Sequence, residues 1–151
     1  MSQEHKLDFL VVDDDEGHIE LVRRNLRRNG ISNTIIPLTN GQAALDYVFC
    51  RGVYAERATN GHLLILLDIN MPGGVDGVEV LRQIKADPKK KKIPVMMLTT
   101  TDDPKEMNRC YTLGCSVYIT KPVEPTAFVE AIHRLGLFIS VVSIPQEEET
   151  A

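Results

Sequence analysis

Residues 63–68 read LLILLD, a run of five apolar side chains that ends in a carboxylate, Asp68. A strand that is apolar at every position is typical of a parallel sheet covered by helices on both faces. Strand-like runs on either side of it alternate with stretches whose apolar residues recur at helical spacing. The sequence therefore predicts an α/β domain, a doubly wound parallel sheet with right-handed crossovers.

The same patterns set the expected elements and boundaries. Short polar residues that can cap helices follow the first four strands, and Pro125 opens the fifth helix. We expect the domain to span residues 7–136, with an N-terminal tail over 1–6 and a C-terminal extension and acidic tail over 137–151. The expected strands are 7–12, 33–38, 63–67, 93–98 and 116–119, the expected caps are Asp15, Asn40, Asp76 and Asp103, and 51–61 is expected to be a polar loop.

Composition excludes several classes of protein. The chain has 151 residues, which suits one domain, and its net charge of −4 disfavours a nucleic-acid-binding module. No apolar run approaches the ~18 residues of a membrane span, and the N-terminus has no signal core, so we expect a cytoplasmic protein. Cys50, Cys110 and Cys115 lack the paired spacing of a zinc site, and we expect free thiols packed in helices.

Reactive side chains follow the predicted strands. Asp13 and Asp14 follow the first strand, Asp68 the third, Thr99 ends the fourth and Lys121 follows the fifth. In an open parallel sheet these carboxyl ends lie at one edge, where ligands bind. Clustered carboxylates suit a hard ion such as Mg²⁺, and an ammonium and a hydroxyl suit phosphoryl oxygens. The set therefore indicates phosphoryl transfer to a carboxylate.

Four segments carry a family resemblance. FLVVDDDE (9–16), LLDINMPG (66–73), VMMLTTTD (95–102) and YITKP (118–122) resemble, in order, the signature segments of response-regulator receiver domains. The resemblance covers about residues 7–136. It implies a flavodoxin-like (βα)5 fold with strand order 2-1-3-4-5. It also implies that Asp68 accepts a phosphoryl group from the phosphohistidine of a histidine kinase.

The resemblance also implies a metal site. Asp14 and Asp68 would bind Mg²⁺ through their carboxylates, and Asp13 would do so mostly through water. The backbone carbonyl of Asn70 would be a further ligand. The side chains of Asn70 and Thr101 occupy positions that influence the dephosphorylation rate in this family.

The remaining site residues are assigned in the same way. Lys121 would pair with Asp68 and then with the phosphoryl group, which Thr99 would also bond. Tyr118 matches the family's rotameric aromatic switch, and Thr99 is its partner in switching. The peptide bond that precedes Pro122 is expected to be cis.

Partners are suggested by two segments. RGVYAERATNGHLLILLDINMP (51–72) resembles the stand-alone regulators that partner cyanobacterial phytochromes, which are light-sensing histidine kinases. Residues 137–144, LFISVVSI, are apolar on both alternating faces and would be a liability if exposed. They are expected either to fold back on the domain or to join a homodimer formed with the fourth helix, fifth strand and fifth helix.

Two other functions remain as alternatives. Asp13 and Asp15 have the spacing of a haloacid-dehalogenase-type phosphatase, in which Asp13 would be the nucleophile, but Glu16 and Gly17 do not suit that motif. A flavin-binding protein of similar topology would need a phosphate-cradling loop after the first strand, and DDDEG would repel a phosphate. We therefore expect a signalling domain that catalyses only its own phosphorylation and dephosphorylation, and no other reaction.

Overall fold

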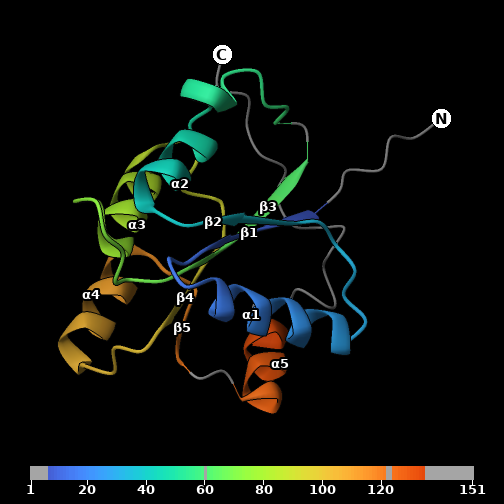
Figure 1. Ribbon diagram of the computed structural model, residues 1–151. Coiled ribbons are helices and arrows are strands. Elements are labelled where there is room, and N and C mark those ends of the chain that lie inside the picture. Colours follow the sequence, from blue (N-terminus) through green and yellow to red (C-terminus); the bar gives the residue numbers. More distant parts are fainter. Residues whose placement is uncertain (1–6, 60, 122–123, 135–151) are drawn as a thin grey trace.

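The computed structural model describes residues 7–59, 61–121 and 124–134, which form a five-stranded parallel sheet flanked by helices (Figure 1). The strand order is β2-β1-β3-β4-β5, as the family resemblance implied. In chain order the elements are β1 (Leu7–Val12), α1 (Glu16–Arg28), β2 (Ile35–Leu38), α2 (Gly41–Val48), a 3₁₀ turn η1 (Gly52–Tyr54), β3 (His62–Leu67), α3 (Gly77–Ala86), β4 (Val95–Thr99), α4 (Pro104–Leu113), β5 (Val117–Thr120) and α5 (Pro125–Arg134).

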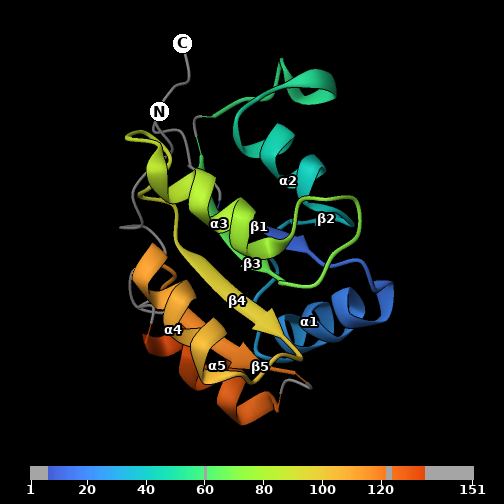
Figure 2. The ribbon, with the colours of Figure 1, turned by 90° about the vertical axis from the view of Figure 1, so that its left-hand side faces the viewer.

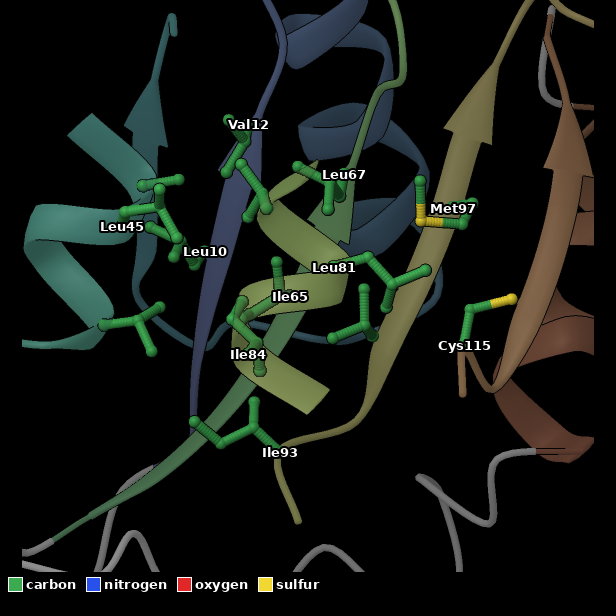
Figure 3. Close-up of a cluster of buried hydrophobic side chains, with 14 of the residues drawn as sticks. Leu10, Val12, Leu45, Ile65, Leu67, Leu81, Ile84, Ile93, Met97 and Cys115 are labelled. Carbon is green, nitrogen blue, oxygen red and sulfur yellow. The ribbon is translucent and has the colours of Figure 1, made fainter. Parts of the chain in front are cut away.

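The sheet separates two apolar layers. Helices α1 and α5 cover one face, and α2, α3 and α4 cover the other (Figures 1 and 2). Alternate residues of each strand point to opposite faces, so Ile65 joins the layer under α3 while Leu64 joins the layer over α1. Figure 3 shows Ile65, Leu67 and Leu81 packed between the sheet and α3.

Strand β3 lies at the centre of the sheet, between β1 and β4. All six of its residues are buried, which confirms that it is covered on both faces. Leu67 lies opposite Val12 in the neighbouring strand. The carboxylates that follow these two strands are therefore brought to the same edge.

Each predicted cap begins its helix. The side chains of Asp15 and Asn40 accept from the backbone N–H groups of Gly17 and Ala43, both at 2.8 Å. Asp76 accepts from Glu79 and Asp103 from Lys105, at 2.9 and 3.0 Å. Because each of these four helices is the next helix along the chain after a parallel strand, their N-termini gather at the carboxyl edge of the sheet.

Some boundaries differ from the expected ones. Strand β2 begins at Ile35 rather than 33, because the Asn33 side chain donates to the Leu7 carbonyl at 2.8 Å. Strand β4 begins at Val95 rather than 93, since a turn in which the Ile93 N–H bonds the Lys90 carbonyl precedes it.

The described part of the expected loop, residues 51–59 and 61, has more local structure than its polarity predicts. It contains the turn η1, and Arg57 anchors it by stacking on the Tyr47 ring at 4.2 Å and donating to the Tyr47 carbonyl at 2.8 Å. A long polar segment is thus tied to the end of α2.

The three cysteines are free thiols, as expected. Only Cys110 lies within a helix, whereas Cys50 follows α2 and Cys115 follows α4. The helical prediction was therefore wrong for two of the three. Burial raises the pKa of the Cys110 and Cys115 thiols to about 11 and about 12, so both remain protonated at neutral pH.

Several predicted features lie outside the described residues. These are the tail over 1–6, the extension over 137–151 and the Pro122 peptide bond. Within the described ranges, no helix is long and apolar enough to cross a membrane.

Candidate functional site

Three carboxylates meet at the carboxyl edge of the sheet. Asp13 follows β1 and Asp68 follows β3, and the Asp68 N–H donates to the Val12 carbonyl at 3.0 Å, which continues the strand pairing to the edge. One carboxylate oxygen from each of Asp13, Asp14 and Asp68 lies within 4.8 Å of the others. Asp13 and Asp68 are buried, while Asp14 is exposed. The sheet thus brings together the carboxylates that the sequence separates by more than fifty positions.

A buried ammonium faces this cluster. Lys121 follows β5, and its backbone N–H donates to the Thr99 carbonyl at 2.8 Å. Its Nζ donates to Asp13 Oδ2 and lies 3.3 Å from Asp68 Oδ2. The Lys121 side chain is only 3% exposed, so its interaction with these carboxylates is little screened by water.

The resemblance led us to expect Lys121 beside Asp68, and the structure places it between Asp68 and Asp13, closer to Asp13. The local reason lies in the loop after β1. Asp13 Oδ1 accepts from the Asp15 N–H at 2.9 Å, and its other oxygen contacts Lys121.

The Asp68 carboxylate is held by its own loop. Its Oδ1 accepts from the Ile69 N–H at 2.8 Å, and the Gly77 N–H donates to the Ile69 carbonyl at 2.8 Å. A Cβ at position 77 would lie 1.9 Å from the Asp68 carbonyl oxygen, so only glycine allows α3 to approach so closely. The start of α3 therefore fixes the backbone that carries Asp68.

His18 is a contact that the sequence reasoning missed. It lies in the first turn of α1, and its Nδ1 is 3.0 Å from Lys121 Nζ and 3.6 Å from Asp13 Oδ2. The available signal was positional, since the helix that follows the acidic loop must start beside the pocket. No pattern pointed to the histidine itself.

The loop after β4 is attached by side chains from the loop after β3 and from β5. Asn70 donates to Thr101 Oγ1 at 3.0 Å, and the Tyr118 hydroxyl donates to the Thr101 carbonyl at 2.6 Å. The Thr101 N–H reaches the buried Thr99 hydroxyl at 3.3 Å. Thr99, Asn70 and Tyr118 thus converge on one residue of this loop.

Tyr118 is buried in the described structure, at 8% exposure. Burial, reinforced by nearby acidic groups, raises the pKa of its hydroxyl to about 12, so the hydroxyl remains a donor at neutral pH. Its backbone N–H donates to the Tyr111 hydroxyl at 3.1 Å, a contact that links α4 to β5 and that the sequence did not suggest.

The parallel sheet and the acidic pocket at its carboxyl edge are those of a flavodoxin-like signalling domain, and comparison with known protein families gives the same class. The model of the response regulator receiver domain matches residues 9–133, so this chain belongs to that family.

Among its relatives is the response regulator Rcp1 of Synechocystis, which is 37% identical over 113 residues, or 75% of each chain. The Mn²⁺-bound structure of Rcp1 has a TM-score of 0.73 at 32% identity, covering 91% of this chain and 98% of that one. A receiver domain structure from Rhodospirillum rubrum has a TM-score of 0.76 at 43% identity, covering 94% and 99%. The phosphorylated cyanobacterial phytochrome response regulator RcpA has a TM-score of 0.77 at 32% identity, covering 95% and 100%.

The chain is therefore a receiver domain of the two-component response regulators, with relatives among the phytochrome response regulators. The comparisons give no support to the haloacid-dehalogenase alternative. Receiver domains bind a divalent metal at their acidic pocket. The cluster of Asp13, Asp14 and Asp68 fits one hard cation, because the three carboxylate oxygens lie close enough together to bind the same ion.

Proposed function

We propose that Asp68 is the phosphoacceptor and that its phosphorylation switches partner binding or dimerisation. The arrangement that supports this is the central position of Asp68, at the end of β3, with Lys121 Nζ at 3.3 Å and the oxygens of Asp13 and Asp14 close by. Asp13 contacts the same ammonium, but it follows β1 rather than the central strand β3. The carboxylate of Asp68 attacks phosphorus in line as the bond to the phosphohistidine nitrogen breaks, and Lys121 neutralises oxygens of the transferring group.

We further propose Mg²⁺ as the ion of this site, held by the carboxylates of Asp14 and Asp68, by Asp13 mostly through water and by the Asn70 carbonyl. The donor set supports this assignment, because Mg²⁺ takes oxygen ligands and retains waters that a phosphoryl group can replace. When bound, such an ion supplies charge neutralisation for the phosphoryl oxygens.

The test of phosphorylation is intact mass after incubation with phosphoramidate, with Mg²⁺ or with EDTA. We expect a single metal-dependent phosphoryl adduct on the wild-type protein and none on Asp68→Asn. Asp76→Asn is the matched control, because asparagine preserves the helix cap and Asp76 lies outside the carboxylate cluster. An adduct that persists in Asp68→Asn and disappears in Asp13→Asn would contradict the assignment.

Thr99 and Tyr118 are the proposed switch residues. Their shared contact is Thr101, whose loop joins β4 to α4. A phosphoryl group that bonds Thr99 shifts the population of this loop and of Tyr118, and a partner that binds one state better then completes the signal. The relevant measurement is partner affinity for wild type and Tyr118→Ala, each with and without phosphorylation, and equal phosphorylation responses would exclude the role of Tyr118.

The proposed kinase is a phytochrome-type histidine kinase. The support is the similarity to Rcp1 and to the phytochrome response regulator RcpA. Radiolabelled phosphotransfer from a phytochrome kinase should be faster than transfer from an unrelated histidine kinase at equal concentration. Equal transfer rates would argue against this pairing.

The proposed homodimer uses α4, β5, α5 and residues 137–144. Tyr111 on α4 is 46% exposed, and Cys110 is the only buried residue among the ten of that helix. Light scattering at tens of micromolar, with and without phosphorylation, should show a dimer that Tyr111→Glu weakens. A monomer in both states would reject it.

A further inference from the structure

The ammonium of Lys121 is surrounded by three acceptors from three different segments. It donates to Asp13 Oδ2, lies 3.0 Å from His18 Nδ1 and lies 3.3 Å from Asp68 Oδ2. An ammonium has three N–H donors and no acceptor. Since the side chain is 3% exposed, water contributes little to its hydrogen bonding, and the loss of one acceptor would leave a buried donor unsatisfied.

The contact defines the tautomer of His18. Because the ammonium can only donate, His18 Nδ1 must present its lone pair, and the ring proton then lies on Nε2. Carboxylate oxygens lie near both ring nitrogens, Asp13 Oδ2 at 3.6 Å from Nδ1 and Asp15 Oδ2 at 3.7 Å from Nε2, so the contact with the ammonium is what decides between the two tautomers. Asp15 is itself held in place, because its other oxygen accepts from the Gly17 N–H at 2.8 Å.

His18 also differs in charge from the other two acceptors. A third carboxylate around Lys121 would add repulsion to a pocket that already holds Asp13, Asp14 and Asp68. A neutral imidazole supplies the acceptor without this cost.

We propose that His18 is a positioning residue that holds the Lys121 ammonium beside Asp68, so that the ammonium is in place when a phosphoryl group arrives. This inference rests on the proposed role of Asp68 as phosphoacceptor. His18 itself does not touch the transferring group, and it acts through Lys121.

The first test is the phosphorylation rate with phosphoramidate in saturating Mg²⁺ for wild type, His18→Ala and His18→Asn. We expect His18→Ala to lower the rate at saturating donor about tenfold, the effect of losing roughly one buried hydrogen bond, and to leave the half-saturating donor concentration nearly unchanged. His18→Asn should stay within about twofold of wild type, because its Oδ1 can replace the Nδ1 acceptor. Arg24→Ala, on the exposed surface of the same helix, is the control and should match wild type.

The second test reads the contact without any phosphorylation. Nitrogen-15 NMR should show His18 protonated on Nε2, and His18→Ala should accelerate hydrogen exchange of the Lys121 ammonium. A ring protonated on Nδ1, or a wild-type phosphorylation rate in His18→Ala, would overturn the proposal. If the wild-type protein accepted no phosphoryl group, the function proposed for Asp68 would fail, and the tautomer would still decide whether His18 holds Lys121.

Discussion

Ile65 and Asp68 lie three positions apart along the chain, and the two positions have opposite effects on stability. Ile65 has no exposed surface and packs under α3, where burial of its side chain favours folding. Asp68 is 7% exposed and shares its edge with two other carboxylates, which disfavours folding. One strand therefore supplies buried apolar surface that favours folding and, at its carboxyl end, a carboxylate of the acidic pocket. Burial in the apolar layers offsets the free-energy cost of clustering charges at that edge.

The largest change in stability is expected from truncating the buried apolar side chain, Ile65. Ile65→Ala leaves a cavity at the centre of the sheet and should destabilise the protein by about 2–5 kcal/mol. Val53→Ala is the matched control, because Val53 is 91% exposed, and should change stability by less than about 0.5 kcal/mol. Urea unfolding measures both, and similar losses for the two variants would contradict the assignment of Ile65 to the core.

The next largest effect on stability is expected at Gly77, where the start of α3 contacts the backbone of Asp68. Gly77→Ala places a Cβ 1.9 Å from the Asp68 carbonyl oxygen, and backbone must move to admit it. We expect a loss of about 1–3 kcal/mol and a slower phosphorylation of Asp68. Gly17→Ala should be tolerated, because its Cβ meets only a side-chain oxygen of Asp15, at 3.0 Å. Wild-type stability and phosphorylation in Gly77→Ala would disprove the close approach.

A smaller effect is expected at the loop after β4. Tyr118→Phe removes the hydroxyl that donates to the Thr101 carbonyl and should cost about 1 kcal/mol at neutral pH, as measured by thermal unfolding. Tyr111→Phe removes an acceptor at a more exposed position and should cost less. Equal losses would show that burial of the Tyr118 hydroxyl is unimportant.

Alkaline pH tests the same hydroxyl with a defined sign. The folded-state pKa of Tyr118 is raised to about 12, above its ordinary value near 10, so its contribution is fully present below pH 10 and is lost as pH rises towards 12. Stability should fall over this range, and less steeply in Tyr118→Phe. The thiols of Cys110 and Cys115 titrate with the same sign, so a Cys110→Ala/Cys115→Ala background should isolate the tyrosine.

The smallest effect should have the opposite sign. Asp14→Asn removes one of three clustered carboxylates, and in EDTA it should stabilise the protein by about 0.5 kcal/mol while weakening its binding of Mg²⁺. Asp102→Asn, also exposed but outside the cluster, should leave both properties unchanged. Destabilisation by Asp14→Asn in EDTA would contradict the view that the carboxyl edge costs stability.

Local patterns in the sequence determined much of the fold and the position of the site. The five strands, the four polar caps and the placement of Asp13, Asp68 and Lys121 at strand ends follow from apolar periodicity and capping, which depend on residues close together in the chain. The strand order and the roles of individual residues came from the family resemblance. The structure confirms the order, and the roles remain proposals.

Only the tertiary structure decided which side chains meet. His18 and Lys121 are 103 positions apart, and Asn70 and Thr101 are 31 positions apart, yet each pair lies at 3.0 Å. The periodicity of apolar residues predicts which face of a helix or strand a residue occupies. Contacts between side chains that are distant in the sequence depend instead on the twist of the sheet, the placement of the helices and the path of the loops. The close approach of Gly77 to Asp68 has the same origin, because helix packing against a strand end decides where a missing Cβ matters.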